Sequence, residues 1–201
     1  MPTTRCHGRV FRLAVMLLLA GLLGGCAAWS TSSASAPPRD SLADFSLQGR
    51  FSLRHEDKNY SGRLSWRHQG VSNEVLLSSP FGQGMAEIVT GAGGAQLTMS
   101  DGQVFAAEDT ETLTQQVLGY PLPLTLLTDW VRGRAVAGQA EQDDFGRLLH
   151  LRQAGWSIDY GYDSDDAQAP PSRIFAQRDG GMDLRLRIDE WRRLSPGEAT
   201  P

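Results

Sequence analysis

Alternation of apolar and polar residues runs through the chain from Phe45 onward, and it restricts the fold more than any other feature. Large apolar residues or glycine occupy every second position from Phe45 to Leu53, with serine, glutamine and arginine between them. A period of two is typical of a β-strand that buries only one face. Comparable segments bounded by turn residues predict about ten strands, at residues 45–54, 60–67, 74–78, 85–90, 96–100, 103–106, 147–152, 156–162, 172–177 and 182–189.

The middle of the chain instead predicts two short helices. Residues 108–118 have Asp109 or Thr110 as an N-cap and Gly119 as a stop. Residues 124–131 follow Pro123 and are rich in leucine, with a tryptophan near the end. They carry more apolar side chains than one exposed helix would tolerate, so this segment must cover something.

Many antiparallel strands with one apolar face each usually close, or nearly close, into a barrel, which removes exposed edges. A barrel of this strand number is wide enough to hold a ligand. The predicted fold is therefore mainly β, an incomplete antiparallel β-barrel with a short helical lid over an apolar cavity. The residues expected in the cavity or its lid are Leu113, Leu118, Leu122, Leu126, Leu127, Trp130, Phe51 and Trp66.

The N-terminal segment has the pattern of a secretory signal, with Arg5, Arg9 and Arg12 before an apolar run. That run is too short for a spanning helix. Its end, Leu23-Gly24-Gly25-Cys26, resembles the bacterial lipobox, in which the cysteine is acylated; an ordinary signal that happens to contain a cysteine is the alternative. We therefore expect a signal peptide at residues 1–25, a lipidated N-terminus and flexible tether at 26–44, a folded domain at 45–194 and a loose tail at 195–201.

Composition narrows the possible partners. Loss of the three signal arginines leaves 16 of the 19 basic residues against 23 acidic ones, a formal charge of −7. Because no run of like charges occurs, we expect no nucleic-acid partner and no attraction to an anionic membrane surface. Cys6 leaves with the signal and Cys26 is the anchor, so the domain is expected to have no disulfide.

The sequence contains no recognisable catalytic or metal-binding pattern. His55, His68 and His150 have no ligand partners at suitable spacing, and no nucleophile or phosphate-binding motif occurs. The glycine-rich segments lie between strands and are interpreted as turns, and the acidic pairs as solvated loops. We therefore expect neither an enzyme nor a bound metal or cofactor.

One tight turn, Ser79-Pro80-Phe81-Gly82, has an unusual composition. Pro80 and Phe81 occupy its two corner positions, which normally face water. Burial of a phenylalanine side chain contributes about 1.5–3 kcal/mol, so an exposed one needs a reason. Phe81 either folds back onto the domain or enters a bilayer or a partner, with Pro80 and Gly82 shaping a membrane-insertion tip.

Several segments together resemble the LolB family of outer-membrane lipoprotein receptors. They are Gly49-Arg50, Trp66, residues 76–82, residues 118–123 with Trp130 and Gly133, residues 153–156, Tyr160, Pro170-Pro171 and Leu186 to Trp191. The resemblance covers roughly residues 45–191 and lies behind a lipobox.

The resemblance implies an outer-membrane anchor facing the periplasm and a cavity for lipoprotein acyl chains. It also implies acceptance of lipoproteins from the periplasmic carrier LolA and their insertion into the inner leaflet of the outer membrane. The family carries a protruding apolar residue, a leucine, at the position of Phe81. We expect a monomer. Two alternatives stay open: a lipoprotein that binds another lipid or amphiphile, and a structural lipoprotein with a packed barrel.

Overall fold

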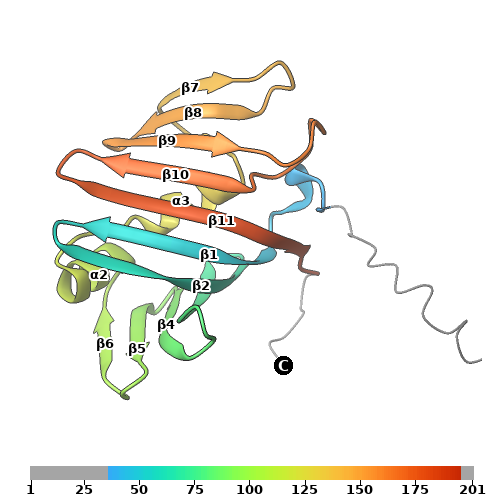
Figure 1. Ribbon diagram of the computed structural model, residues 1–201. Helices are drawn as coiled ribbons and strands as arrows, with labels where there is room; N and C mark the ends of the chain where they lie inside the picture. The colour runs from blue at the N-terminus through green and yellow to red at the C-terminus, as the bar shows by residue number, and fades with distance from the viewer. Residues whose placement is uncertain (1–35, 196–201) are drawn as a thin grey trace, which may run out of the picture. The chain divides into compact units, whose positions relative to one another are not determined.

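The computed structural model describes residues 36–195. The predicted signal peptide, Cys26, the tether up to residue 35 and the tail from residue 196 lie outside the described residues. Within the described part, eleven strands form one antiparallel sheet in the order β6-β5-β4-β3-β2-β1-β11-β10-β9-β8-β7 (Figure 1). The strands are β1 (Phe45–His55), β2 (Lys58–Gln69), β3 (Ser72–Ser78), β4 (Gly84–Gly91), β5 (Gly94–Met99), β6 (Val104–Ala107), β7 (Gln139–Gln142), β8 (Leu148–Gln153), β9 (Trp156–Gly161), β10 (Arg173–Arg178) and β11 (Met182–Arg193).

The sheet consists of two meanders, β1–β6 and β7–β11, which are joined where β1 pairs with β11. This pairing runs from Phe45 opposite Arg193 to His55 opposite Met182, with one irregularity between Gln48 and Gly49. The edge strands β6 and β7 do not pair with each other in the described part, so the sheet remains open. The predicted class, mainly β with an incomplete antiparallel barrel, is confirmed.

Two helices cover one face of the sheet, here called the inner face: α2 (Thr110–Leu118) and α3 (Leu124–Val131). Figure 1 shows α3 behind the sheet and α2 near β6. Asp109 is the N-cap of α2, since its carboxylate accepts a hydrogen bond from the Thr112 amide at 2.7 Å. Gly119 ends α2 in the left-handed conformation, with φ of +81°. Helix α3 has the predicted bounds.

The main core lies between the inner face and α3. Its largest fully buried side chains include Phe45, Leu47, Trp130, Leu151 and Ile158. A second, smaller cluster forms where Leu113 of α2 packs against Ala95 and Leu97 of β5. The alternation predicted for the strands explains this arrangement, because every second side chain of each strand points to the same face.

The packed core begins earlier than residue 45, where the predicted domain starts. A short 3-10 helix, η2 (Arg39–Ser41), precedes Leu42, which is only 1% exposed. The guanidinium of Arg132, just after α3, donates to the carbonyls of Leu42 and Ala43, each at 3.3 Å. The last residues of the predicted tether, from Arg39 to Asp44, are therefore packed against the folded domain.

Strand β7 was not predicted. All four of its residues, from Gln139 to Gln142, are exposed, so it has no apolar alternation from which to recognise it. It is an edge strand held by backbone pairing with β8. Strand β11 also continues beyond the predicted residue 189, to Arg193. Between residues 36 and 195, no helix combines the length and the apolar character needed to cross a membrane.

Candidate functional site

An apolar cavity of about 310 Å³ lies between the inner face of strands β1–β5 and β11 and the two helices. This volume is near the lower end of the roughly 300–1,000 Å³ found for small-molecule sites. Its lining contains no charged residue, and Tyr60 contributes the one side-chain hydroxyl. The lining residues are Phe51, Leu53, Tyr60, Leu64, Trp66, Val75, Leu77, Met85, Ala86, Leu97, Met99, Val117, Leu118, Leu122, Leu124, Leu127, Leu184 and Leu186.

Five of the eight residues predicted for the cavity and its lid meet there. Phe51 and Trp66 reach it from β1 and β2, and Leu118, Leu122 and Leu127 reach it from the helical segment. Phe51 and Trp66 share the inner face because period two assigns alternate side chains of a strand to the same face. Most of the other lining residues, such as Val75, Met85 and Met99, were not predicted as individual positions.

The other three predicted residues, Leu113, Leu126 and Trp130, do not line the cavity. Leu113 is on the first half of α2 and packs against β5. Leu126 is offset by two residues from Leu124, which at about 100° per residue turns it away from the cavity face of α3. Trp130 is fully buried one turn further along α3.

Trp130 fixes the position of α3 over the sheet. Its indole nitrogen donates to Gln153 Oε1 at 2.7 Å, and its ring lies 5.7 Å from that of Trp156. At the other end of the lid, Thr114 Oγ1 accepts a hydrogen bond from the Leu122 amide at 2.8 Å. Both ends of the helical segment are therefore held, and the cavity lies beneath the connection between them.

A buried polar cluster borders the cavity and supports Trp66. The Trp66 indole donates to Asn73 Oδ1 at 3.0 Å, and the Asn73 amide donates to Thr90 Oγ1 at 3.1 Å. His68 Nδ1 lies 2.9 Å from the same Asn73 oxygen. Burial is the main cause that lowers the pKa of His68, and the charge of Arg132 lowers it further. The cluster satisfies the polar edge of Trp66 and leaves its ring as an apolar wall.

The turn between β3 and β4 places Phe81 in solvent, with 94% of the residue exposed. The Gly82 amide donates to the Ser79 carbonyl at 2.9 Å, and Gly82 has φ of +86°, a conformation that glycine adopts without strain. Ser79 Oγ accepts from the Gln83 amide at 3.2 Å, which further fixes the loop. Phe81 is thus held outward on a hydrogen-bonded turn and does not fold back onto the core.

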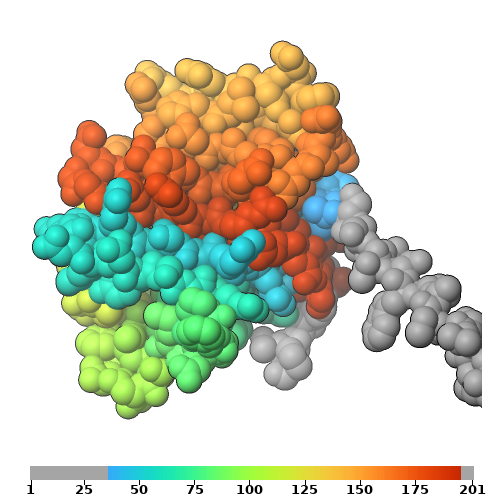
Figure 2. All heavy atoms as spheres, viewed as in Figure 1, coloured from blue at the N-terminus to red at the C-terminus, as the bar shows by residue number. Residues whose placement is uncertain are grey.

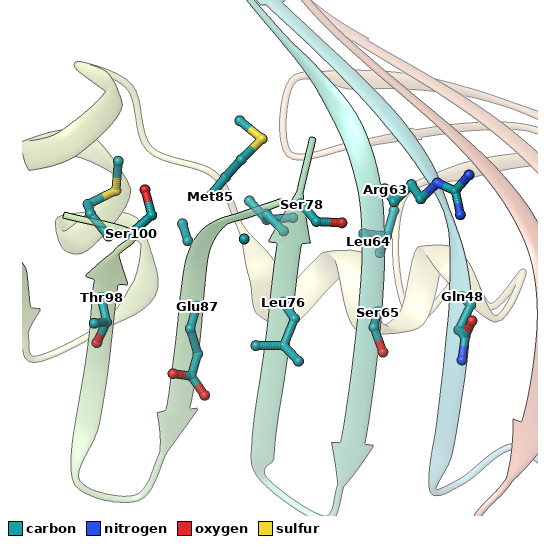
Figure 3. A pocket seen from close by; sticks show the side chains of 14 residues that line it. Gln48, Arg63, Leu64, Ser65, Leu76, Ser78, Met85, Glu87, Thr98 and Ser100 are labelled. Carbon is teal, nitrogen blue, oxygen red and sulfur yellow. The ribbon is translucent and has the colours of Figure 1, made fainter. Parts of the chain in front are cut away.

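Larger hollows of the described part differ in character. One of about 530 Å³ lies on the outer face of the sheet beside the foot of this hairpin, and its lining includes Arg63, Gln48 and Glu87 (Figure 3). Another, of about 720 Å³, lies at the β8–β9 and β10–β11 turns, with Arg152 and Asp179 among its residues. Among residues 36–195, no group of three or more His, Cys, Asp or Glu side chains could hold a metal ion. The candidate site is therefore the apolar cavity together with the Phe81 hairpin.

An open antiparallel sheet with two helices over one face defines a mainly β protein with an apolar cavity between sheet and helices. The family model described as outer membrane lipoprotein LolB matches residues 43–191. This protein belongs to the LolB family of outer-membrane lipoproteins.

Relatives described as outer-membrane lipoprotein LolB resemble nearly the whole chain. The protein of Dechloromonas aromatica (strain RCB) is 42% identical over 184 residues, which cover 88% of this chain and 95% of that protein. The protein of Thiobacillus denitrificans (strain ATCC 25259 / T1) is 39% identical, with 90% and 97% covered. Among solved structures, a LolA superfamily protein of Nitrosomonas europaea aligns with a TM-score of 0.48 at 12% identity, covering 76% of this chain and 86% of that one.

Proposed function

We propose that this protein is an outer-membrane receptor that faces the periplasm and is anchored through acylated Cys26. It accepts lipoproteins from a LolA-like periplasmic carrier by taking their acyl chains into the cavity. It then inserts them into the inner leaflet of the outer membrane, with the Phe81 hairpin as the element that enters the bilayer. Membership of the LolB family supports the receptor role.

The observation that carries the proposal is the cavity lining, which offers an acyl chain only apolar side chains and one tyrosine. Each methylene removed from water contributes about 0.8 kcal/mol, so ten buried methylenes would contribute roughly 8 kcal/mol before the costs of binding. No charged group is needed to hold such a ligand. Release into a bilayer follows because the bilayer removes the same surface from water, so that transfer depends only on the difference between two affinities.

The alternative of a packed structural barrel does not fit a cavity of about 310 Å³ that is lined from both the sheet and the helices. A binding protein for another amphiphile would have the same apolar lining. The two binding functions differ in whether lipoproteins move from the carrier to this protein.

Transfer from the carrier is therefore the test. A complex of the carrier with a radiolabelled lipoprotein is mixed with the full mature protein in detergent micelles, and the lipoprotein is followed by affinity capture of either partner. We expect the label to move to this protein. Label that remains with the carrier, while an acyl-type fluorescent probe still binds the cavity, would contradict the receptor function and favour the other amphiphile.

A cavity-filling variant links this transfer to the site. Ala86 is on the inner face of β4 and lines the cavity, so Ala86→Phe should occupy part of its volume and reduce uptake of the probe and of the lipoprotein at least tenfold. Ala106→Phe is the matched control, because Ala106 is exposed on β6. Equal uptake by the two variants, with folding intact by circular dichroism, would place the acyl site elsewhere.

A further inference from the structure

Four arginines form a line across the outer face of the sheet, the face opposite the helices. Strand register places Arg63 of β2 opposite Arg50 of β1, Arg50 opposite Arg187 of β11, and Arg187 opposite Arg173 of β10. Neighbouring strands are about 4.8 Å apart, so this arginine line spans roughly 15 Å. Figure 2 is viewed from this side of the sheet, opposite α3.

The arginine line is only partly neutralised. Asp189 forms a bidentate pair with Arg50, at 2.9 and 3.2 Å, and Asp163 forms one with Arg187, at 2.7 and 3.1 Å. Arg173 shares Asp163 at 3.5 Å. Arg63 is exposed and forms no ion pair with any residue between 36 and 195. Three of the four arginines thus share two carboxylates, and Arg63 pairs with neither, in a chain whose formal net charge is −4.

Such a line costs stability in the isolated domain. Like charges directly opposite one another on neighbouring strands are destabilising, and exposed ion pairs offset only part of this cost. The side chains of Arg50 and Arg173 remain 63% and 58% exposed, so their guanidinium groups are available to an external partner. The matching partner is a surface that presents several anions side by side.

The position of the arginine line beside the Phe81 hairpin indicates which kind of anionic surface it would meet. The register partner of Arg63 on β3 is Ser78, which immediately precedes the turn, so the arginine line leads directly to the foot of the hairpin. Arg63, Ser78 and Met85 border the same outer-face hollow, and Figure 3 shows Arg63 of β2 level with the end of β3 at Ser78 and the start of β4 at Met85. Guanidinium groups bind phosphate oxygens in a bidentate manner, and a bilayer presents phosphates next to the apolar region that Phe81 would enter.

We propose that the arginine line binds the phosphate headgroups of an anionic membrane and so orients the domain for entry of Phe81 into the bilayer. This inference rests on the proposed function, in which the hairpin contacts the membrane. An acidic protein partner would fit the charges alone, but it would not explain why the line ends at an exposed apolar hairpin.

The test uses the mature acylated protein reconstituted in vesicles of phosphatidylcholine, with or without phosphatidylglycerol. The mature chain would have Cys26 as its only cysteine, so Gln83→Cys at the exposed end of the turn provides one thiol for an environment-sensitive fluorophore. The fluorophore reports the fraction of hairpins inserted. We expect more insertion when phosphatidylglycerol is present, and loss of this difference in about 1 M salt, where the Debye length falls to about 3 Å.

The variant Arg63→Gln/Arg173→Gln removes both ends of the line and leaves the two bidentate pairs intact. Each basic residue near an anionic surface contributes about fivefold to binding, so the inserted-to-free ratio should fall about 30-fold in phosphatidylglycerol vesicles and little in phosphatidylcholine. Arg134→Gln/Arg152→Gln removes the same charge from exposed positions outside the line and should leave the ratio near the wild-type value.

Three outcomes would overturn the inference. The first is insertion that does not depend on phosphatidylglycerol, and the second is an equal loss in both double variants. The third is normal insertion of the Arg63/Arg173 variant together with a failure to accept lipoprotein from the carrier, which would assign the line to an acidic protein. Lipoprotein delivery by the wild type is measured in the same vesicles: delivery without lipid dependence removes only this inference, whereas absence of delivery removes the proposed function.

Discussion

Replacement of Phe81 by alanine tests the separation between folding and membrane entry. Because 94% of Phe81 is exposed, the free energy of unfolding should change by no more than about 0.5 kcal/mol, as for other surface positions. A core phenylalanine would instead lose about 3–5 kcal/mol. If the same ring is buried in a bilayer, its removal sacrifices about 1.5–3 kcal/mol of transfer free energy, which weakens insertion by one to two orders of magnitude.

Two measurements on the same preparation decide this. Urea unfolding followed by tryptophan fluorescence gives the stability, and delivery of a carrier-bound lipoprotein into vesicles gives the membrane step. We expect Phe81→Ala to retain stability and acyl uptake but to slow delivery, Phe81→Leu to remain near wild type, and Phe81→Glu to abolish delivery. Val71→Glu is the matched control, because Val71 is 74% exposed in the β2–β3 turn.

Either of two results would contradict a Phe81 side chain that is exposed in solution and enters the membrane. A loss of 2 kcal/mol or more in the stability of Phe81→Ala, on the scale expected for core side chains, would mean that the ring packs against the domain in solution. Delivery at the wild-type rate by Phe81→Glu, with Val71→Glu also normal, would mean that the hairpin does not enter the membrane.

Two further predictions concern the structure that frames the cavity. Burial holds the pKa of His68 below its usual range, so its contribution to stability is complete above the unfolded-state pKa of about 6.5 and is lost as the pH falls through the lower folded-state value. Urea titrations from pH 7.5 to 4.5 should show this loss as a falling free energy of unfolding, and His68→Gln should make that free energy depend less on pH. An equally steep pH dependence in His68→Gln would contradict the prediction. Trp130→Phe keeps an aromatic ring but leaves Gln153 without its donor, so it should lower the unfolding free energy by about 1–3 kcal/mol. Binding of the acyl-type probe per folded molecule should stay within twofold of the wild type, since Trp130 does not line the cavity. A large loss of probe binding at unchanged stability would mean that Trp130 belongs to the binding site.

Local sequence predicted the elements of this fold well where burial leaves a periodic trace. The strand from Phe45 and the helix from Leu124 could be placed because their apolar residues recur at the period of the element. The Ser79–Gly82 turn was also predicted from its residues, although the sequence left open whether Phe81 folds back onto the domain. The edge strand from Gln139 to Gln142 has no apolar alternation in its sequence, because it is held by backbone pairing and buries none of its residues.

The cavity required the tertiary structure. Rotation of α3 about its axis decides which of its apolar residues face the ligand space, and that rotation is set by contacts distant in sequence. Arg132 binds the backbone at Leu42, and Trp130 docks on Gln153 and Trp156. These contacts direct Leu124 and Leu127 toward the cavity and Leu126 away from it, a distinction that the composition of the helix does not contain.

The position of the arginine line likewise could not be predicted from the order of charged residues in the sequence. Because charged residues are scattered along the chain, we expected no attraction to an anionic membrane surface, and that expectation considered only neighbours in sequence. Alternation determines that Arg50 and Arg187 face outward on their strands, and this much belongs to the sequence alone. Their position opposite each other depends on the register between the first and last strands, which is decided by packing of the interior side chains between them. The sequence by itself determined the helices, the strands other than β7 and the outward faces, whereas tertiary packing decided which of those faces meet and therefore where the cavity and the charge lie.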